Sequence, residues 1–190
     1  MDLVLRPDRM PGSVMVSTGR SDEVIFPTVD AAVSTAARAQ RKFHALSLEV
    51  RKAVIKAMRK TSIASAERWG RMAVEETKMG RADDKTQKNI LCATRTPGVE
   101  DLHSRAYTGD EGLTLVEYAP FGVVAAVTPS NNPAATVISN AIAILSAGNA
   151  VVFAPHPSAA GLQSSGALPS GHGPGRPASS SGRKPANAYP

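Results

Sequence analysis

The chain has 190 residues, a formal net charge of +6 and a pI near 9.8. Hydrophobic residues make up 42% and charged residues 20%, which is typical of a soluble domain that buries a core. The single cysteine, Cys92, excludes an intrachain disulfide and a zinc site built from cysteines. No apolar run approaches the roughly 18 residues of a membrane span, and the N-terminus has no apolar secretory segment. We therefore expect a cytoplasmic protein.

The positive charge is concentrated near the C-terminus. The last thirty residues contain Arg176, Arg183 and Lys184 but no acid, so they supply about half of the excess. In the rest of the chain the basic residues alternate with Asp and Glu along expected helices, as on solvated helix faces. We expect neither a nucleic-acid partner nor a membrane partner.

The N-terminal half of the chain indicates helices. Residues 1–22 mix Pro, Gly, Ser and Arg without a sustained period and are expected to form a flexible arm. Thr28 is placed to cap a first Ala-rich helix, and Ser47 to open a second. A third helix is expected from about Ser65 to a C-cap at Gly80, and a shorter one over 84–93.

The pattern then changes to that of strands. Residues 113–118 alternate at period 2, which predicts a half-exposed strand belonging to a hairpin. Residues 123–128 are apolar on both faces, as in a central parallel strand. A polar turn, an apolar helix over 134–146 and a second buried strand over 150–154 follow. Strand, helix and strand in this order predict a βαβ unit, and so an α/β fold with a parallel sheet.

The character of the sequence changes again at residue 159. Residues 159–190 are dominated by Gly, Ser, Pro and Ala, and they cannot bury enough apolar surface to offset the entropy of ordering. We expect a disordered tail, and an altered reading frame or an abrupt truncation explains the change better than a natural linker. The expected organisation is an arm over 1–22, a domain over 23–158 and a tail over 159–190.

Several motifs within 23–158 are similar to those of one enzyme family. The segment at 117–133, EYAPFGVVAAVTPSNNP, resembles the strand and turn that open the Rossmann-like dinucleotide-binding domain of aldehyde dehydrogenases. The segment at 147–153, AGNAVVF, resembles the strand that follows. Four further motifs resemble the branch that acylates coenzyme A, the acetaldehyde and propionaldehyde dehydrogenases of ethanolamine and propanediol breakdown: ETKMGR at 76–81, TPGVEDL at 96–102, GDEGLT at 109–114 and FAPHP at 153–157.

The resemblance implies an N-terminal part of such an enzyme, with N-terminal helices beside the first βαβ unit of an incomplete dinucleotide-binding domain. It implies NAD-dependent oxidation of a short aldehyde, acetaldehyde or propionaldehyde, by a cysteine thiolate, with transfer of the acyl group to coenzyme A. The family forms homo-oligomers. The family's nucleophile comes much later in the chain, so this polypeptide is expected to be inactive alone.

The same resemblance assigns candidate site residues. Asn131 stands where many aldehyde dehydrogenases place an amide that donates to the developing oxyanion. The acylating branch often has threonine there, so the role could be shared with Asn132 or moved to it. Alternatively, both asparagines satisfy backbone groups in the turn.

A second group of candidates concerns the dinucleotide. Thr128, Pro129 and Ser130 match the turn that lines its nicotinamide-ribose side. Ala154 stands where the wider family has a lysine that holds the adenosine ribose, a lysine that the acylating branch also lacks. His156, in a Pro-His-Pro turn, is either a contact to the cofactor or coenzyme A or a solvent-facing turn residue.

Other reactive residues receive structural interpretations. Cys92 lies near the end of an expected helix, with no histidine or helix N-terminus to lower its pKa, so it is expected to be a half-buried packing residue and not the nucleophile. The histidines lack metal-ligand spacing, and no metal is predicted. Trp69 and the methionines at helical spacing are expected to be core or helix-packing residues and not part of a cofactor site.

Two alternatives stay open. The chain could be a non-catalytic nucleotide-binding module, or a pseudoenzyme fragment, with a flexible basic tail. It could also belong to the aldehyde dehydrogenases that release free acid, although the motifs between 76 and 114 argue against this. Members of the acylating branch enter bacterial microcompartments through an N-terminal amphipathic helix, and residues 1–20 do not offer one.

Overall fold

The computed structural model describes residues 26–164 and 188–189, so the expected arm over 1–22 lies outside it. The elements in chain order are α1 (Val29–His44), α2 (Leu48–Thr77), α3 (Ala82–Arg95), the 3-10 turn η2 (Val99–Asp101), β1 (Arg105–Gly109), β2 (Gly112–Val116), β3 (Val123–Val127), α4 (Pro133–Ser146), β4 (Ala150–Ala154), the 3-10 turn η3 (Pro157–Ala159), α5 (Ala160–Ser164) and β5 (Ala188–Tyr189).

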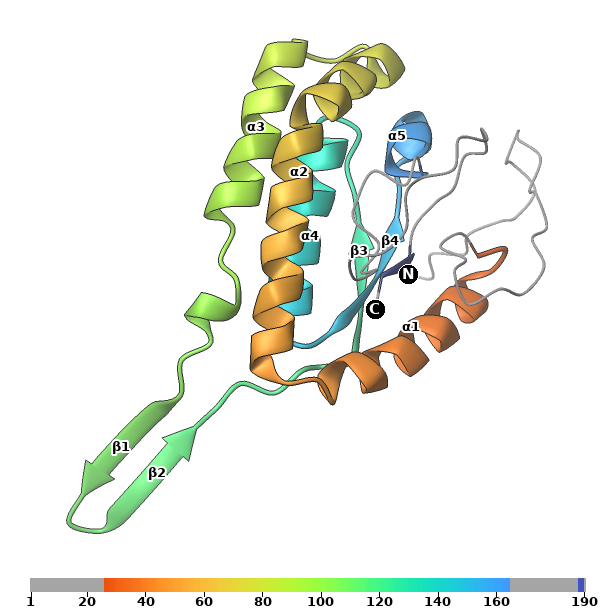
Figure 1. Ribbon diagram of the computed structural model, residues 1–190. Coiled ribbons are helices and arrows are strands. Elements are labelled where there is room, and N and C mark those ends of the chain that lie inside the picture. Colours follow the sequence, from red (N-terminus) through yellow and green to blue (C-terminus); the bar gives the residue numbers. More distant parts are fainter. Residues whose placement is uncertain (1–25, 165–187, 190) are drawn as a thin grey trace, which may run out of the picture.

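The predicted βαβ unit is confirmed. β3 and β4 pair in parallel, with α4 as the crossover, and the two-residue strand β5 pairs antiparallel with β4. Figure 1 shows α4 between the strands and the α2–α3 pair. The helix α1 also contacts β3 and β4. Ala150 and Val151 are both fully buried although neighbouring strand residues point to opposite faces, so the start of β4 is covered on both sides. The fold is α/β, as predicted.

The helix starts are confirmed and one helix boundary is wrong. The Thr28 hydroxyl accepts from the Ala31 N–H at 3.2 Å, and the Ser47 hydroxyl from the Val50 N–H at 3.4 Å. The expected second and third helices are one 30-residue helix, α2. Residues 59–65 contain neither proline nor glycine, so nothing interrupts it there. It ends at Thr77, and its C-cap residue Lys78 takes the left-handed conformation (φ 58°), two residues before the expected cap at Gly80.

The helices α2 and α3 pack closely enough at Gly70 that no side chain fits between their backbones. Gly70 is buried, and a Cβ added to it would lie 2.5 Å from Thr86 Oγ1 and 2.8 Å from the Ala82 carbonyl oxygen. One helical turn away along the interface, the buried Asn89 amide donates to the Ala66 carbonyl at 3.1 Å. Trp69 is 1% exposed, which confirms its place in the core.

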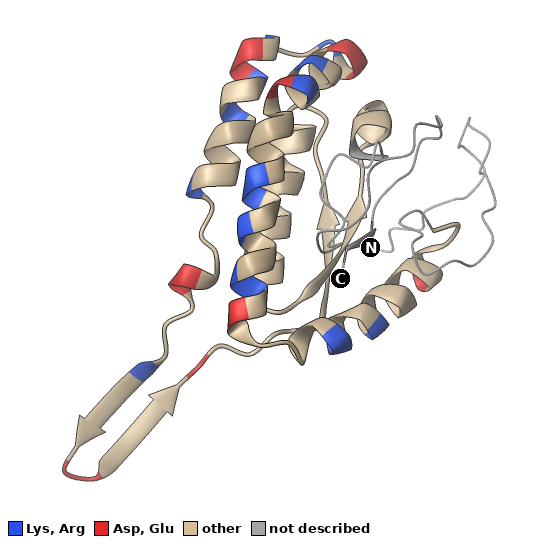
Figure 2. Ribbon diagram, viewed as in Figure 1, with Lys and Arg blue, Asp and Glu red and all other residues tan. Residues whose placement is uncertain are grey.

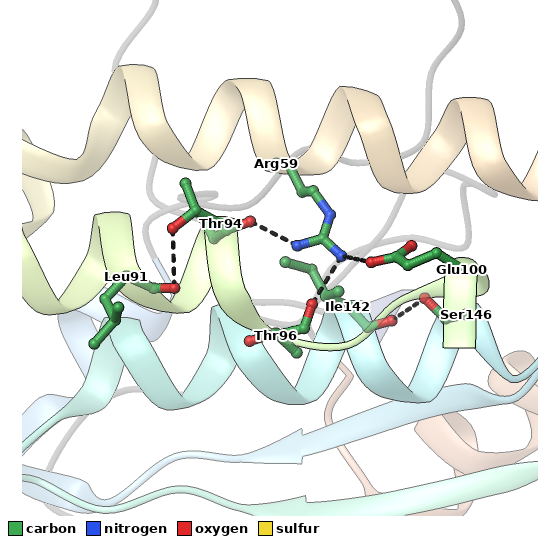
Figure 3. A network of polar contacts seen from close by, with 8 residues as sticks. Arg59, Leu91, Thr94, Thr96, Glu100, Ile142 and Ser146 are labelled. Carbon is green, nitrogen blue, oxygen red and sulfur yellow. Dashed lines mark hydrogen bonds and ion pairs between the residues drawn. The ribbon is translucent and has the colours of Figure 1, made fainter. Parts of the chain in front are cut away.

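A single arginine fixes the C-terminal end of α3 (Figure 3). Arg59, on α2, donates to the carbonyls of Ala93 at 2.9 Å and Thr96 at 2.8 Å, and it pairs with Glu100 at 2.7 Å. Carbonyls at a helix end have no partner within the helix, and a cationic donor both satisfies them and complements the helix dipole. The link from α3 to η2 is thereby tied to α2.

The hairpin and the first parallel strand are more exposed than expected. β1 and β2 form the predicted antiparallel hairpin, but all ten of their residues are exposed, so neither strand is half-buried. Figure 1 shows the hairpin projecting away from the helices. In β3 only Ala126 is buried, and Val127 is 82% exposed, so β3 is not covered on both faces as a central strand would be.

The expected loss of structure at residue 159 does not hold for the residues that are described. η3 and α5 continue the fold to residue 164, and Ala159 and Leu162 are buried in the core. The Glu76 carboxylate accepts from the N–H groups of Gly161 and Leu162, each at 2.7 Å. Two apolar side chains and one carboxylate therefore contribute to holding this turn. Residues 165–187 lie outside the description, and β5 over 188–189 falls within the expected tail.

The charges mostly lie on exposed helix faces. Figure 2 shows basic residues along the N-terminal half of α2 and a mixture of acids and bases where α2 leads into α3. Exposed pairs such as Lys52–Glu49 and Arg71–Glu67 contribute little to stability. Within the described ranges, no helix combines the length and the apolar character needed to cross a bilayer.

We expect Gly70→Ala to destabilise the chain by about 1–3 kcal/mol, because the added methyl must displace the Ala82 carbonyl and the Thr86 hydroxyl. The effect opposes the usual gain of roughly 1 kcal/mol for alanine over glycine in a helix. The matched control is Gly109→Ala in β1, where nothing lies within 4 Å of the added Cβ. Thermal unfolding followed by circular dichroism checks the order, and a Gly70→Ala variant as stable as the control would contradict the close contact.

We expect Glu76→Ala to loosen α5, since it removes the acceptor of two N–H groups, at a cost of about 1–2 kcal/mol. The neighbouring Glu75→Ala is the control, because Glu75 is exposed and accepts no hydrogen bond from a described residue. Limited proteolysis with mass spectrometry should give a stable fragment ending near 164 for the control and near 158 for Glu76→Ala. Equal fragments would show that the carboxylate does not hold this turn.

Candidate active site

The predicted dinucleotide residues meet at the carboxyl ends of β3 and β4. The parallel register places Val127 opposite Ala154, so the segments that follow the two strands are neighbours. We call residues 128–132 and 154–156 the strand-end site. Ligands of open α/β sheets bind outside the carboxyl ends of the strands. The position of the site is therefore the one that a dinucleotide-binding fold requires.

Thr128 locks the two segments together. It is 1% exposed, its N–H donates to the Ala154 carbonyl at 3.1 Å, and its hydroxyl donates to the same oxygen at 3.3 Å. A buried hydroxyl needs such a partner, because an unsatisfied one costs about 1–3 kcal/mol. Thr128 thus contributes to the site through its backbone and its place in the turn.

The opposite ends of the same strands are joined by Asn149, which is 5% exposed. Its Oδ1 accepts from the Gly122 N–H at 3.0 Å, and the Ala150 N–H donates to the Gly122 carbonyl at 2.8 Å. Gly122 has φ +114° and Gly148 has φ +80°, conformations that disfavour side chains. The Gly-Asn motif recognised in the sequence therefore sets the register that brings the strand-end site together.

The other dinucleotide candidates lie at the surface. Pro129, Ala154 and His156 are exposed and Ser130 is half-buried. His156 Nδ1 contacts the Ser158 hydroxyl at 2.8 Å and accepts from the Ser158 N–H at 3.2 Å, so it caps η3. Its Nε2 is not involved in this cap. The exposed set leaves the strand ends open to a ligand.

The two candidate oxyanion residues stand at the N-terminus of α4. Asn132 is the N-cap residue and Pro133 the first helical residue, as is common for proline. The Asn132 side chain does not cap the helix, and its Oδ1 accepts from Lys88 Nζ at 3.4 Å. Asn131 is exposed, and its side-chain amide makes no hydrogen bond with a described residue. The alternative that both side chains satisfy turn backbone groups finds no support among the described residues.

Two lysines of α3 reach this turn, and the sequence did not reveal them. Lys85 is 7% exposed, and its Nζ donates to the Asn131 carbonyl. Lys88 Nζ donates to Asn132 Oδ1. Burial, and then the nearby Lys88 charge, lower the pKa of Lys85. In the sequence, both lysines fall on the polar face of an expected helix. Solvent-exposed lysines occur at the same kind of position, so the sequence does not distinguish the two cases. With the helix N-terminus they make this end of the site electropositive.

Cys92 is on α3, half-buried, and is not part of the strand-end site. Burial raises the pKa of its thiol, as expected for a half-buried packing residue. Among the described residues, no three His, Cys, Asp or Glu side chains are grouped to hold a metal.

A family model for the aldehyde dehydrogenase family matches residues 11–164, most of the chain. The chain belongs to the aldehyde dehydrogenase family. It is 48% identical, over 83% of its length, to an acetylating acetaldehyde dehydrogenase of Salmonella typhimurium, and 43% identical, over 71%, to a CoA-propanoylating propanal dehydrogenase of Citrobacter freundii. It covers 32% and 29% of those proteins, so the chain spans about a third of the length of these relatives.

Solved structures of the family agree with the fold. A propionaldehyde dehydrogenase of Rhodopseudomonas palustris, with bound CoA and an acylated cysteine, superposes with a TM-score of 0.71 at 47% identity over 73% of this chain and 32% of that one. An engineered glycolyl-CoA reductase with bound NADP+ gives 0.72 at 44% identity over 77% and 33%. The resemblance to the acylating branch seen in the motifs is confirmed.

We expect Cys92 to react slowly with a thiol reagent, because its raised pKa leaves little thiolate and the residue is only partly exposed. At about pH 8 the native chain should react at least about tenfold more slowly than the same chain unfolded in guanidinium, and the rate should rise further with pH. Absorbance of the released thiolate of an aromatic disulfide reagent checks this, with Cys92→Ala as the blank. A native rate equal to the unfolded rate would contradict the assignment as a packing residue.

Proposed function

We propose that this chain forms the dinucleotide side of a CoA-acylating aldehyde dehydrogenase, which oxidises acetaldehyde or propionaldehyde to the acyl-CoA with NAD. The observation that carries the proposal is the parallel pairing of β3 with β4, which brings residues 128–132 beside residues 154–156 at one sheet edge. The most similar relatives described above include an acetylating and a CoA-propanoylating enzyme, and structural relatives have bound CoA or NADP+.

The residues of the strand-end site fit a dinucleotide. The small Ala154 methyl group and Pro129 are both exposed at the strand ends, where a ligand can approach the backbone. Thr128, Pro129 and Ser130 would line the nicotinamide-ribose side, and Ala154 and His156 the neighbouring side, where coenzyme A could also be held. When bound, the dinucleotide accepts hydride from the aldehyde carbon.

Asn131 and Asn132 would stabilise the oxyanion. The exposed amide of Asn131 offers N–H donors, and the N-terminus of α4 adds a favourable potential for negative charge. We assign the donor role to Asn131 first, because the Asn132 oxygen is engaged by Lys88. Asn132 then contributes by starting the helix.

The second candidate function, binding without catalysis, is favoured by the place of Cys92. This residue, the only cysteine of the 190, is half-buried on α3 with a raised pKa. We propose that these residues alone bind ligand and do not oxidise aldehyde, because Cys92 is not placed to act as the nucleophile. A mixture of the chain, acetaldehyde, coenzyme A and NAD should produce no NADH absorbance.

Homo-oligomerisation and a cytoplasmic location, or a microcompartment, remain proposals; one structural relative comes from such a compartment.

We expect the chain to bind NADH and coenzyme A, and Ala154→Glu to weaken NADH binding by about tenfold or more. The longer side chain would occupy the space of the adenosine ribose, which the resemblance places at residue 154, and a tenfold loss corresponds to about 1.4 kcal/mol. The matched control is Ala143→Glu, since Ala143 is exposed on α4. Fluorescence titration with NADH and calorimetry with coenzyme A give the affinities. Equal losses in both variants, or no binding by the parent chain, would sink the proposal.

A further inference from the structure

Lys85 is unusual among the lysines of this chain because it is buried. Its residue is 7% exposed, whereas Lys52, Lys56, Lys60 and Lys88 are all exposed. A lysine is rarely covered to this extent without a partner, since removing an ammonium from water costs several kcal/mol. Among the described residues, its ammonium has one hydrogen-bond acceptor, the backbone carbonyl of Asn131. The buried ammonium therefore has a specific structural target.

That target lies across the fold from α3. Lys85 and Asn131 are separated by 46 residues, and Asn131 stands in the turn between β3 and α4. Lys88, one turn further along α3, reaches the side-chain oxygen of the next residue, Asn132, at 3.4 Å. Two successive asparagines are thus engaged by two lysines on one side of one helix. The orientation of this turn is set by α3 as well as by the strand that precedes it.

The Lys85 side chain is itself held in place. A Cβ added to Gly80 would lie 3.2 Å from Lys85 Cε and 3.7 Å from its Nζ, so the loop after α2 lies against the lysine stem. Lys85, Asn89 and Ala93 form the buried stripe of α3, and Asn89 is fixed by its bond to the Ala66 carbonyl. The ammonium is consequently held by a packed helix face, and its side chain does not extend into solvent.

We propose that Lys85 is a positioning residue, which fixes the Asn131 backbone so that the Asn131 side-chain amide faces the ligand. This role rests on the proposed function of Asn131 as the oxyanion donor. Lys85 binds the carbonyl and leaves the amide free to donate. An oxyanion donor is effective only when it is held near its productive geometry before the reaction, because reorienting it later costs free energy. Lys85 supplies this restraint without touching the substrate itself.

The test uses the 190-residue chain without ligand. Lys85→Met keeps the length of the stem and removes the ammonium. We expect the side-chain amide resonances of Asn131 to shift or broaden in a two-dimensional nitrogen–proton NMR spectrum. We also expect exchange of the Thr136 amide, which donates to the Asn132 carbonyl and closes the first turn of α4, to accelerate about tenfold. If the methionine variant does not fold, Lys85→Gln, whose donor is one atom short, should give the same changes.

The matched control is Asn89→Ala, one turn along the same buried stripe. It removes a structural hydrogen bond to α2 and should lower the melting temperature, while the Asn131 resonances and Thr136 exchange stay close to the parent values. Unchanged Asn131 resonances in both Lys85 variants, or equal changes in Asn89→Ala, would overturn the positioning role. Because no ligand is present, this result is independent of NADH and coenzyme A binding, on which the proposed function depends.

Discussion

The pairing of β3 with β4 is held at both ends by side chains, and the rest of the site depends on it. At the amino ends, Asn149 accepts from the Gly122 N–H; at the carboxyl ends, Thr128 donates twice to the Ala154 carbonyl. A slip of one residue would exchange the faces of both strands and break both sets of bonds. The same register places residues 128–132 and residues 154–156 side by side. The family motifs at these positions therefore describe a register as much as a binding surface.

Local patterns were enough to predict most elements, because they report on local physics. Thr28 and Ser47 cap helices by bonds that span three residues, and the apolar runs over 134–146 and 150–154 match the buried helix α4 and the strand β4, whose start is buried. Where local signals were weak, the predictions were wrong. No residue in 59–65 indicates whether α2 continues or ends there. The C-cap with left-handed backbone was expected at Gly80 and lies at Lys78. The composition gave a wrong prediction for residues 159–164, because Ala159 and Leu162 are buried in the core.

The candidate site was predicted as far as its chain segments and not as far as its supports. Residues 128–132 and 154–156 follow from motif resemblance, but Lys85 could not be found in this way. A lysine on a helix looks the same in a sequence whether it points to water or to a carbonyl 46 residues away. The direction of the Lys85 side chain depends on how α2, α3 and α4 pack. The close contact of Gly70 on α2 with Thr86 on α3 is part of that packing. Long-range tertiary contacts are the part that periodicity leaves undetermined.

The exposed hairpin of β1 and β2 has a thermodynamic consequence. Its ladder of five residue pairs is bonded within itself, and no residue in it is buried. A two-stranded hairpin without a packed face is only marginally stable in water. Its strands can consequently open while α2, α3 and α4 stay closed, so the molecule has at least two cooperative units. The melting of the helices and the fraying of the hairpin are then separate equilibria, and a single free energy of unfolding describes only the former.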